Sequence, residues 1–313
     1  MARIAALFPG QGSQKVGMGH DLADRWPTAA AVFSEIDEGL GVSLSDLCWN
    51  GPEDELRLTT NTQPALLTHS IAAWRVLSEF GFAAEAVAGH SLGEYSAVVA
   101  ADGLGAVDAA RTVRERGRLM QQAVPVGVGA MAAVLGLDDE TVVALCLEIT
   151  ADGGEAVVAA NFNSPGQVVI AGTAGAVERA IEACKEKGAR RALPLPVSAP
   201  FHSPLMAPAR QGLEPTLHAL DFHDLRVPVY RNVDAEPILR ADEVRDGLIR
   251  QVDAPVLWSQ TITRMLADGF DTFVEIGAGN VLCGLVKRID RSATSYPAGT
   301  VEGVEKVLAE LVG

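Results

Sequence analysis

Short apolar runs alternate along the chain with stretches of helical periodicity, a pattern typical of α/β proteins. The first run, residues 2–8, predicts a strand. A long apolar helix is expected next, with Thr62 as its N-cap, Pro64 in its first turn and its end near Phe80. Residues 85–88 then predict a short buried strand that leads directly into a glycine-flanked turn and a further helix.

From about residue 127 to residue 197 the order of predicted elements becomes β-α-β-β-α-β, the ferredoxin-like unit of about 70 residues. Its strands are expected at 130–137, 155–161, 167–172 and 189–197, and its helices at 138–149 and 173–187. The α/β pattern then resumes, with strands at 227–232 and 272–276 and helices near 243–252 and 259–269.

These elements predict two domains. We expect a larger α/β-hydrolase-like domain with a mostly parallel sheet, formed by residues 1–126 and 198–313. A smaller ferredoxin-like subdomain, residues 127–197, is inserted between its two segments.

The amino-acid composition limits the classes of protein to which this chain can belong. Hydrophobic residues make up 48% of the 313 positions and charged residues 21%, as expected for a globular protein with a sizeable core. The formal charge of −15 repels nucleic acid and anionic membranes, and no apolar run is long enough to span a bilayer. The four cysteines are scattered, which favours a reducing compartment over disulfides or a metal site. We therefore expect a cytoplasmic protein with no metal and no nucleic-acid or membrane partner.

The segment Gly89-His90-Ser91-Leu92-Gly93 matches the G-x-S-x-G pattern. Between a strand and a helix, this pattern places a serine on a sharp turn, where the first free N–H groups of the helix face charge developing on a substrate oxygen. The other interpretation is a glycine-rich loop with a capping serine. The predicted strand and helix on either side favour a nucleophile.

A serine nucleophile needs a base, and the histidines offer few candidates. His90 cannot easily turn back on the neighbouring serine. His202 lies in a loop stiffened by Pro200 and Pro204, where it suits a general base, although a surface histidine in a turn remains the alternative. In α/β-hydrolases the catalytic histidine comes late in the chain, whereas no histidine follows His223 here. This order weighs against an ordinary hydrolase.

One arginine lies near the buried face of a predicted helix over residues 108–124. The apolar stripe of this helix is centred on Val113, and Arg116 lies only about 60° from that centre. Three other arginines fall about 100–160° away, where solvent is expected: Arg111, Arg114 and Arg118. Two interpretations of Arg116 stay open, an internal salt bridge or a clamp for a substrate carboxylate.

Taken together, these residues resemble the malonyl-CoA:acyl carrier protein transacylases of dissociated fatty-acid synthesis over nearly the whole chain. The resemblance rests on several blocks in one order, at 8–14, 62–65, 89–96, 116–117, 161–167, 199–202, 250–251 and 275–279. It implies that Ser91 is the acylated nucleophile and His202 its base, with the backbone carbonyl of Gln251 orienting the imidazole. It also implies an oxyanion hole formed by the N–H groups of Gln11 and Leu92.

The resemblance assigns the acyl site as well. It implies that Arg116 holds the malonyl carboxylate and that Asn161, Asn163 and His90 make further substrate contacts. Phe201 resembles the bulky residue that precedes the histidine in malonyl-selecting acyltransferases, where it fills the space of a methyl branch. The chain departs from the family pattern at Ala199, Pro200 and Ala278.

The activity implied is ping-pong transfer of malonyl from malonyl-CoA to the phosphopantetheine thiol of acyl carrier protein. No cofactor is expected beyond the coenzyme A thioester as substrate, and a monomer is expected. The alternatives are a serine thioesterase, a malonyl transferase of a polyketide pathway, and a carrier-binding module without turnover. An acidic carrier would need a basic docking surface, and six residues are candidates for it: Lys185, Lys187, Arg190, Arg191, Lys287 and Arg288. The alternative is that these residues form only a solvated charged surface.

Overall fold

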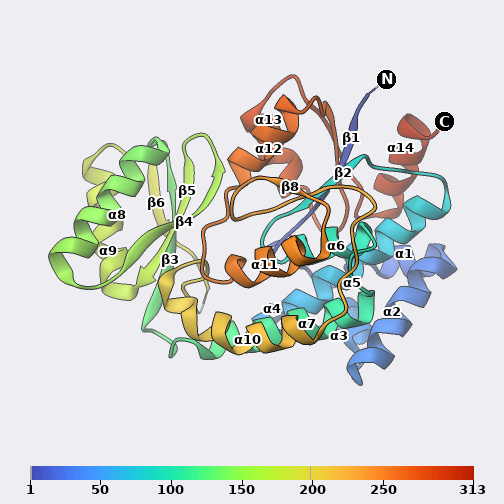
Figure 1. The fold of residues 1–313 in the computed structure, drawn as a ribbon, viewed down its shortest axis with the longest axis horizontal. Helices are drawn as coiled ribbons and strands as arrows, with labels where there is room; N and C mark the ends of the chain where they lie inside the picture. The colour runs from blue at the N-terminus through green and yellow to red at the C-terminus, as the bar shows by residue number, and fades with distance from the viewer. Residues whose placement is uncertain (1, 198) are drawn as a thin grey trace.

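The structure is a computed structural model that describes residues 2–197 and 199–313. Met1 and Ser198, the first residues of the two segments predicted for the larger domain, lie outside the described residues. The strands form a six-stranded sheet and a four-stranded sheet, which lie in the right and left parts of Figure 1.

The six-stranded sheet has the order β10-β9-β1-β2-β7-β8. Its first five strands are parallel, and β8 pairs antiparallel with β7. The bounds are β1 Ile4–Phe8, β2 Ala86–Gly89, β7 Val229–Tyr230, β8 Pro237–Ile238, β9 Thr272–Glu275 and β10 Thr294–Pro297. The mostly parallel sheet predicted from the sequence is confirmed.

Helices cover both faces of this sheet, so the central strands β1 and β2 are apolar throughout. Along β1, Ala6 and Phe8 pack into one cluster, whereas Ala5 and Leu7 pack into the other. The first cluster includes α5 Thr59–Glu79, α6 Gly93–Ala100, α7 Ala106–Gln122, α10 Ala207–Ala219 and α11 Ala241–Gln251. The second includes α12 Trp258–Ala267 and α13 Val281–Ile289.

The four-stranded sheet is antiparallel, with the order β4-β5-β3-β6. Its elements follow the predicted β-α-β-β-α-β order: β3 Gly129–Leu135, α8 Asp139–Gly153, β4 Val157–Ser164, β5 Gln167–Thr173, α9 Ala174–Glu186 and β6 Arg191–Pro194. Asp138 and Thr173 are the N-caps of the two helices, and their side chains accept hydrogen bonds from the N–H groups of Thr141 and Ala176. The ferredoxin-like unit is therefore confirmed.

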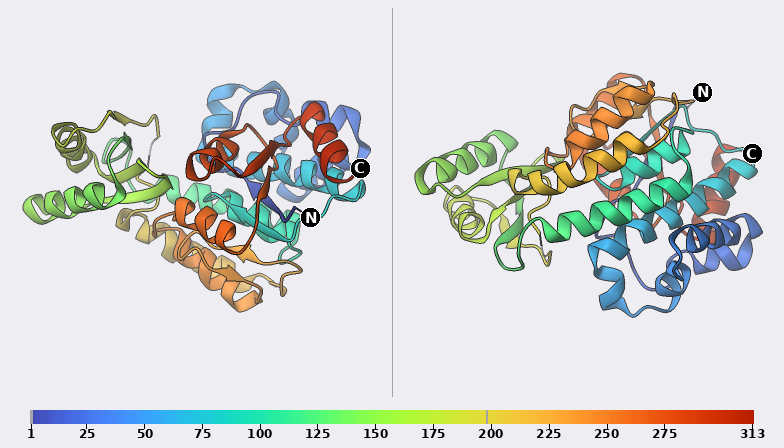
Figure 2. Two further views of the ribbon diagram at one scale, coloured as in Figure 1. Left: turned by 90° about the horizontal axis from the view of Figure 1, so that it is seen from above. Right: turned by 60° about the horizontal axis from the view of Figure 1, so that its bottom comes forward.

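Strand β4, at the edge of the smaller sheet, is hydrogen-bonded to the segment that precedes α12 in the larger part of the molecule. The N–H of Phe162 in β4 donates to the carbonyl of Val256 at 2.9 Å, and the N–H of Val256 donates to Ala160 at 2.9 Å. On the opposite side, α10 runs beside α7, as both views of Figure 2 show. These connections fix the smaller sheet over the carboxyl ends of β1 and β2.

The start of α5 differs from the expectation. The helix begins at Thr59, so Thr62 is not its cap but lies inside it and donates to the carbonyl of Leu56 at 2.6 Å. Pro64 also lies inside the helix rather than in its first turn. The chain turns earlier because the N–H of Asn61 and that of Thr62 both donate to the carbonyl of Leu58.

Sequence periodicity misses α10 and α13 in the second half of the chain, together with five helices nearer its two ends. These five are α1 His20–Arg25, α2 Pro27–Leu40, α3 Leu44–Asn50, α4 Glu53–Arg57 and α14 Val301–Leu311. Most are short, and such helices depend on packing against neighbours rather than on local propensity. Of the helices within the described residues, none is both long and apolar enough to cross a membrane.

Candidate active site

The turn after β2 places Ser91 in a strained position, with φ at 51°. Two glycines make this turn possible. A Cβ on Gly89 would lie 1.9 Å from the backbone of Gly93, and a Cβ on Gly93 would lie 2.1 Å from the carbonyl oxygen of Phe8. The G-x-S-x-G pattern is therefore a close packing of β1, β2 and α6 that presents the serine at its apex.

Asn232, which the sequence analysis did not single out, holds this turn in place. Its Oδ1 accepts from the N–H of Ser91 at 2.6 Å, and its Nδ2 donates to the carbonyl of Gly89 at 2.7 Å. The side chain is fully buried and follows β7, the neighbour of β2. The adjacent strand thus fixes the backbone on both sides of the serine.

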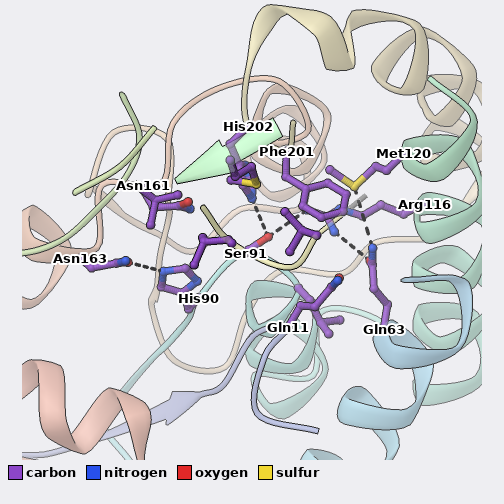
Figure 3. Close-up of a pocket in the computed structure, with 15 residues that line it drawn as sticks. Gln11, Gln63, His90, Ser91, Arg116, Met120, Asn161, Asn163, Phe201 and His202 are labelled. Carbon is purple, nitrogen blue, oxygen red and sulfur yellow. Dashed lines mark hydrogen bonds between the residues drawn. The ribbon is translucent and has the colours of Figure 1, made fainter. Parts of the chain in front are cut away.

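The structure brings Ser91 and His202 together, although they are 111 residues apart in sequence. Ser91 Oγ lies 2.7 Å from His202 Nε2 (Figure 3). His202 Nδ1 lies 3.0 Å from the carbonyl oxygen of Gln251 and 3.1 Å from that of Ala254. Because carbonyl oxygens only accept, Nδ1 carries the proton and Nε2 is free to accept from the serine hydroxyl. No carboxylate is needed to set this tautomer.

His202 is neutral in this environment. Burial, followed by the positive charge of Arg116, lowers the pKa of His202 to about 3. Its backbone has a φ of 56°, and its side chain is almost fully buried. The loop therefore holds an uncharged imidazole in a fixed orientation toward the serine.

Arg116 is buried beside the serine, with 1% of its surface exposed. Its Nη1 donates to Gln63 Oε1 at 2.8 Å, and its Nη2 donates to Gln251 Oε1 at 2.9 Å and to Ser91 Oγ at 3.2 Å. Its Nε has no partner within the described part of the chain. The guanidinium therefore contacts neutral acceptors, and the internal salt bridge considered above is not formed with any described residue.

Two further residues complete the network beneath the serine. The Nε2 of Gln251 donates to the carbonyl of Ser91 at 2.9 Å and to Glu94 Oε2 at 2.9 Å. The N–H of Asn232 donates to the same Glu94 oxygen at 2.9 Å. Sequence reasoning used only the backbone of Gln251 and missed Glu94, whose signal is a carboxylate inside an otherwise apolar helix directly after the motif.

The remaining predicted residues line the same crevice as Ser91 and Arg116: Gln11, Leu92, His90, Asn161, Asn163 and Phe201. His90 Nε2 lies 2.8 Å from Asn163 Oδ1, which connects the serine turn to β4 of the smaller sheet. In the described residues, no group of His, Cys, Asp or Glu side chains is arranged to hold a metal ion. The crevice thus offers a serine, an imidazole and a cation, all positioned by amides and backbone groups.

Comparison with known proteins gives one consistent result. Residues 6–306 match the acyl transferase domain family. The malonyl CoA-acyl carrier protein transacylase of Bacillus subtilis is 48% identical over 99% of this chain and 98% of its own. The Escherichia coli K12 protein of the same name is 49% identical over 97% of this chain and all of its own.

Solved structures are equally similar. An acyl carrier protein S-malonyltransferase from Vibrio cholerae has a TM-score of 0.95 at 46% identity and covers 98% of this chain and 100% of its own. A malonyl-transacylase in complex with its type II PKS acyl-carrier protein has a TM-score of 0.96 at 45% identity and covers 98% and 99%. In sequence and in fold, this chain belongs to the malonyl-CoA:acyl carrier protein transacylase family of acyltransferases.

Proposed function

We propose that this protein transfers the malonyl group of malonyl-CoA to the phosphopantetheine thiol of acyl carrier protein. One observation carries the proposal: a buried guanidinium, that of Arg116, lies 3.2 Å from the hydroxyl oxygen of Ser91 and contacts no described carboxylate. A cation in this position selects an acyl group that brings its own negative charge. A malonyl group does so, whereas an acetyl group does not.

In the first half-reaction, His202 Nε2 takes the hydroxyl proton of Ser91, and the serine oxygen attacks the thioester carbonyl. The N–H groups of Gln11 and Leu92 are the proposed donors to the resulting oxyanion. The intermediate then collapses, the C–S bond breaks, and the sulfur of coenzyme A takes the proton from His202. The product is a malonyl ester of Ser91.

The second half-reaction reverses these steps with a different thiol. His202 takes the proton of the phosphopantetheine thiol, whose sulfur attacks the malonyl ester. The C–O bond to Ser91 breaks, and the serine oxygen takes the proton back from His202. An ester and a thioester are exchanged, so no cofactor is proposed.

The malonyl carboxylate also raises the basicity of His202, the base of the reaction. In the empty site the charge of Arg116 lowers the pKa of His202. A carboxylate bound to the guanidinium offsets this charge, so the pKa of His202 rises toward the range in which a base is effective. The clamp therefore favours malonyl in binding and in the chemical step.

The proposed carrier-docking surface is the basic patch predicted above, all of whose members are exposed. Two contacts bring parts of it to the junction between the sheets. Arg288 in α13 donates to the side chain of Gln167 at the start of β5, and Arg190 packs against Gly136 at the end of β3. An acidic carrier would meet this patch with opposite charge.

The carrier pathway, location and oligomeric state are also proposals. Relatives include a partner of a type II PKS carrier, so we propose fatty-acid synthesis as the pathway with polyketide synthesis as the alternative. Four free, buried cysteines support a cytoplasmic location. We propose a monomer.

The test is to incubate the protein with malonyl-CoA labelled in its acyl group. A transferase forms a stable malonyl-serine until a thiol acceptor arrives, whereas a thioesterase releases malonate. We expect one label per chain, its transfer to added acyl carrier protein, and no label in Ser91→Ala. Label that persists in Ser91→Ala, or malonate released without a carrier, would contradict the proposal. Comparing fatty-acid and polyketide carriers as acceptors distinguishes the two pathways.

A further inference from the structure

The charge of Arg116 is balanced in the empty site by an indirect contact. A buried cation is costly unless an opposite charge lies near it. Arg116 Nη2 donates to Oε1 of the Gln251 amide, and Nε2 of the same amide donates to Glu94 Oε2, with both distances 2.9 Å. Glu94 is 2% exposed and receives only N–H groups of amides. One amide thus connects a buried cation to a buried carboxylate.

We propose that Glu94 is the counter-ion of Arg116 in the empty site, and that it binds a proton from solvent when the malonyl carboxylate takes over this role. The inference rests on the proposed malonyl clamp. With malonyl bound, two carboxylates would share Arg116, and their mutual repulsion favours neutralising Glu94, which is buried and contacts no cation directly. Glu94 is therefore a positioning residue that acts on substrate through Gln251 and Arg116.

The charged groups around Glu94 place it close to neutrality. Burial raises the pKa of Glu94 to about 7, opposed by hydrogen bonds from Gln251 and Asn232 and by the charge of Arg231, while Asp234 raises it further. On α7, burial lowers the pKa of Arg116, and this effect is opposed by Tyr95 and by the charge of Glu94. From the histidine loop, His202 stays neutral because its pKa is lowered to about 3, and burial also lowers the pKa of His90.

The sign of the coupling follows from linkage. An anion bound at Arg116 raises the pKa of Glu94, so the complex binds more protons than the free protein. Malonyl affinity is therefore greatest below the free pKa of about 7 and falls as the pH rises above it. At one pH unit above that pKa, the cost is about tenfold in affinity.

The chain offers a variant that removes this charge with little change of shape. The N–H groups of Gln251 and Asn232 both bind the same oxygen of Glu94, Oε2. In Glu94→Gln, the amide oxygen can accept both bonds, so the network is kept and only the charge is lost. Glu94→Asp keeps the charge and is the conservative control.

The experiment is titration calorimetry of the Ser91→Ala protein, which binds without transferring. Malonyl-CoA and acetyl-CoA are compared near pH 8 in buffers of different ionisation enthalpy. Both ligands carry the same phosphates, so the difference in proton uptake reports the acyl carboxylate alone. We expect malonyl-CoA to take up most of one proton per site more than acetyl-CoA, and Glu94→Asp to keep this difference.

In Glu94→Gln the difference in proton uptake should vanish, and malonyl-CoA should bind about tenfold more tightly at pH 8 than to the parent, with little change at pH 6. Equal uptake for the two ligands in the parent protein, or uptake that survives in Glu94→Gln, would overturn the inference. If Glu94→Gln fails to fold, the difference in proton uptake between malonyl-CoA and acetyl-CoA in the Ser91→Ala protein still tests the inference. Failure of the clamp itself is recognised separately, because Arg116→Ala would then leave malonyl preference intact.

Discussion

At the scale of single residues, the charge of Arg116 influences the pKa of the neighbouring base, His202. The guanidinium donates to Ser91 Oγ and lowers the pKa of His202, so the empty site holds a serine whose base is weakened. Burial is the larger cause of this lowered pKa; we expect an acyl group with a carboxylate to offset the part that is due to Arg116, whereas a neutral acyl group leaves it in place. We therefore expect specificity at this scale to be electrostatic, and not to depend on the shape of the crevice alone.

We expect Arg116→Ala to lower kcat/KM for malonyl-CoA about 100-fold or more, because the carboxylate would be buried without a partner. Activity with acetyl-CoA should be unchanged or higher, so the preference for malonyl should approach one. Steady-state kinetics with the two thioesters measure this. Arg118→Ala, an exposed position on the same helix, is the control. A preference that survives in Arg116→Ala would remove the clamp from the mechanism.

At the scale of secondary-structure elements, the helices α5 and α7 approach each other closely beside the site. Gly117 in α7 faces the start of α5, and a Cβ at this position would lie 2.6 Å from the carbonyl oxygen of Thr59. This approach brings Gln63 of α5 within 2.8 Å of Arg116, the residue before the glycine. The earlier start of α5 is therefore part of the site, since the extra turn packs on α7.

Substituting this glycine tests the helix crossing. Gly117→Ala should destabilise the protein by about 1–3 kcal/mol, because the new methyl group has no space, and should raise KM for malonyl-CoA by displacing Arg116. Gly284→Ala is a matched control, because this glycine also lies inside a helix but has open space at its Cβ. The control should gain up to about 1 kcal/mol from helix propensity. Thermal unfolding and kinetics measure both effects, and equal behaviour of the two variants would argue against a tight crossing.

At the scale of the whole molecule, the crevice lies between a rigid parallel sheet and a smaller antiparallel one. The hydrogen bond from His90 to Asn163 and the pairing of Phe162 with Val256 hold the two together. The proposed carrier patch lies on the smaller subdomain and on α13; the smaller subdomain is at the opposite end of the molecule from α1 (Figure 1). The overall charge is −15, so we expect an acidic carrier to bind at this local basic surface rather than through the mean field of the protein.

Charge reversal tests the docking surface. Arg190→Glu combined with Arg191→Glu should raise KM for acyl carrier protein about tenfold and weaken its dependence on salt, with KM for malonyl-CoA unchanged. Arg25→Glu in α1 is the distant control. The measurement is transfer kinetics at two ionic strengths. An unchanged KM for the carrier would exclude this patch.

How far the sequence predicts this site depends on the range of the interactions. The serine turn can be predicted from residues 89–93, because the two glycines and the flanking strand and helix are adjacent to the serine in sequence. The position of Arg116 near the buried face follows from helix periodicity alone. Thr62 as a helix cap was wrong, because the helix start is set by hydrogen bonds to Leu58 and by packing on α7.

The sequence by itself determined the strands and helices on either side of the serine, the inserted ferredoxin-like unit and the chemical groups available for acyl transfer, because periodicity, turn residues and motif spacing act over short distances along the chain. Only the tertiary structure decided that Asn232 fixes the serine turn, that two carbonyls orient His202, and that Glu94 is linked to Arg116 through Gln251. These contacts join residues up to 157 positions apart. Such pairs leave no local pattern, since burial and hydrogen bonding between distant segments exist only once the sheet and its helices have packed.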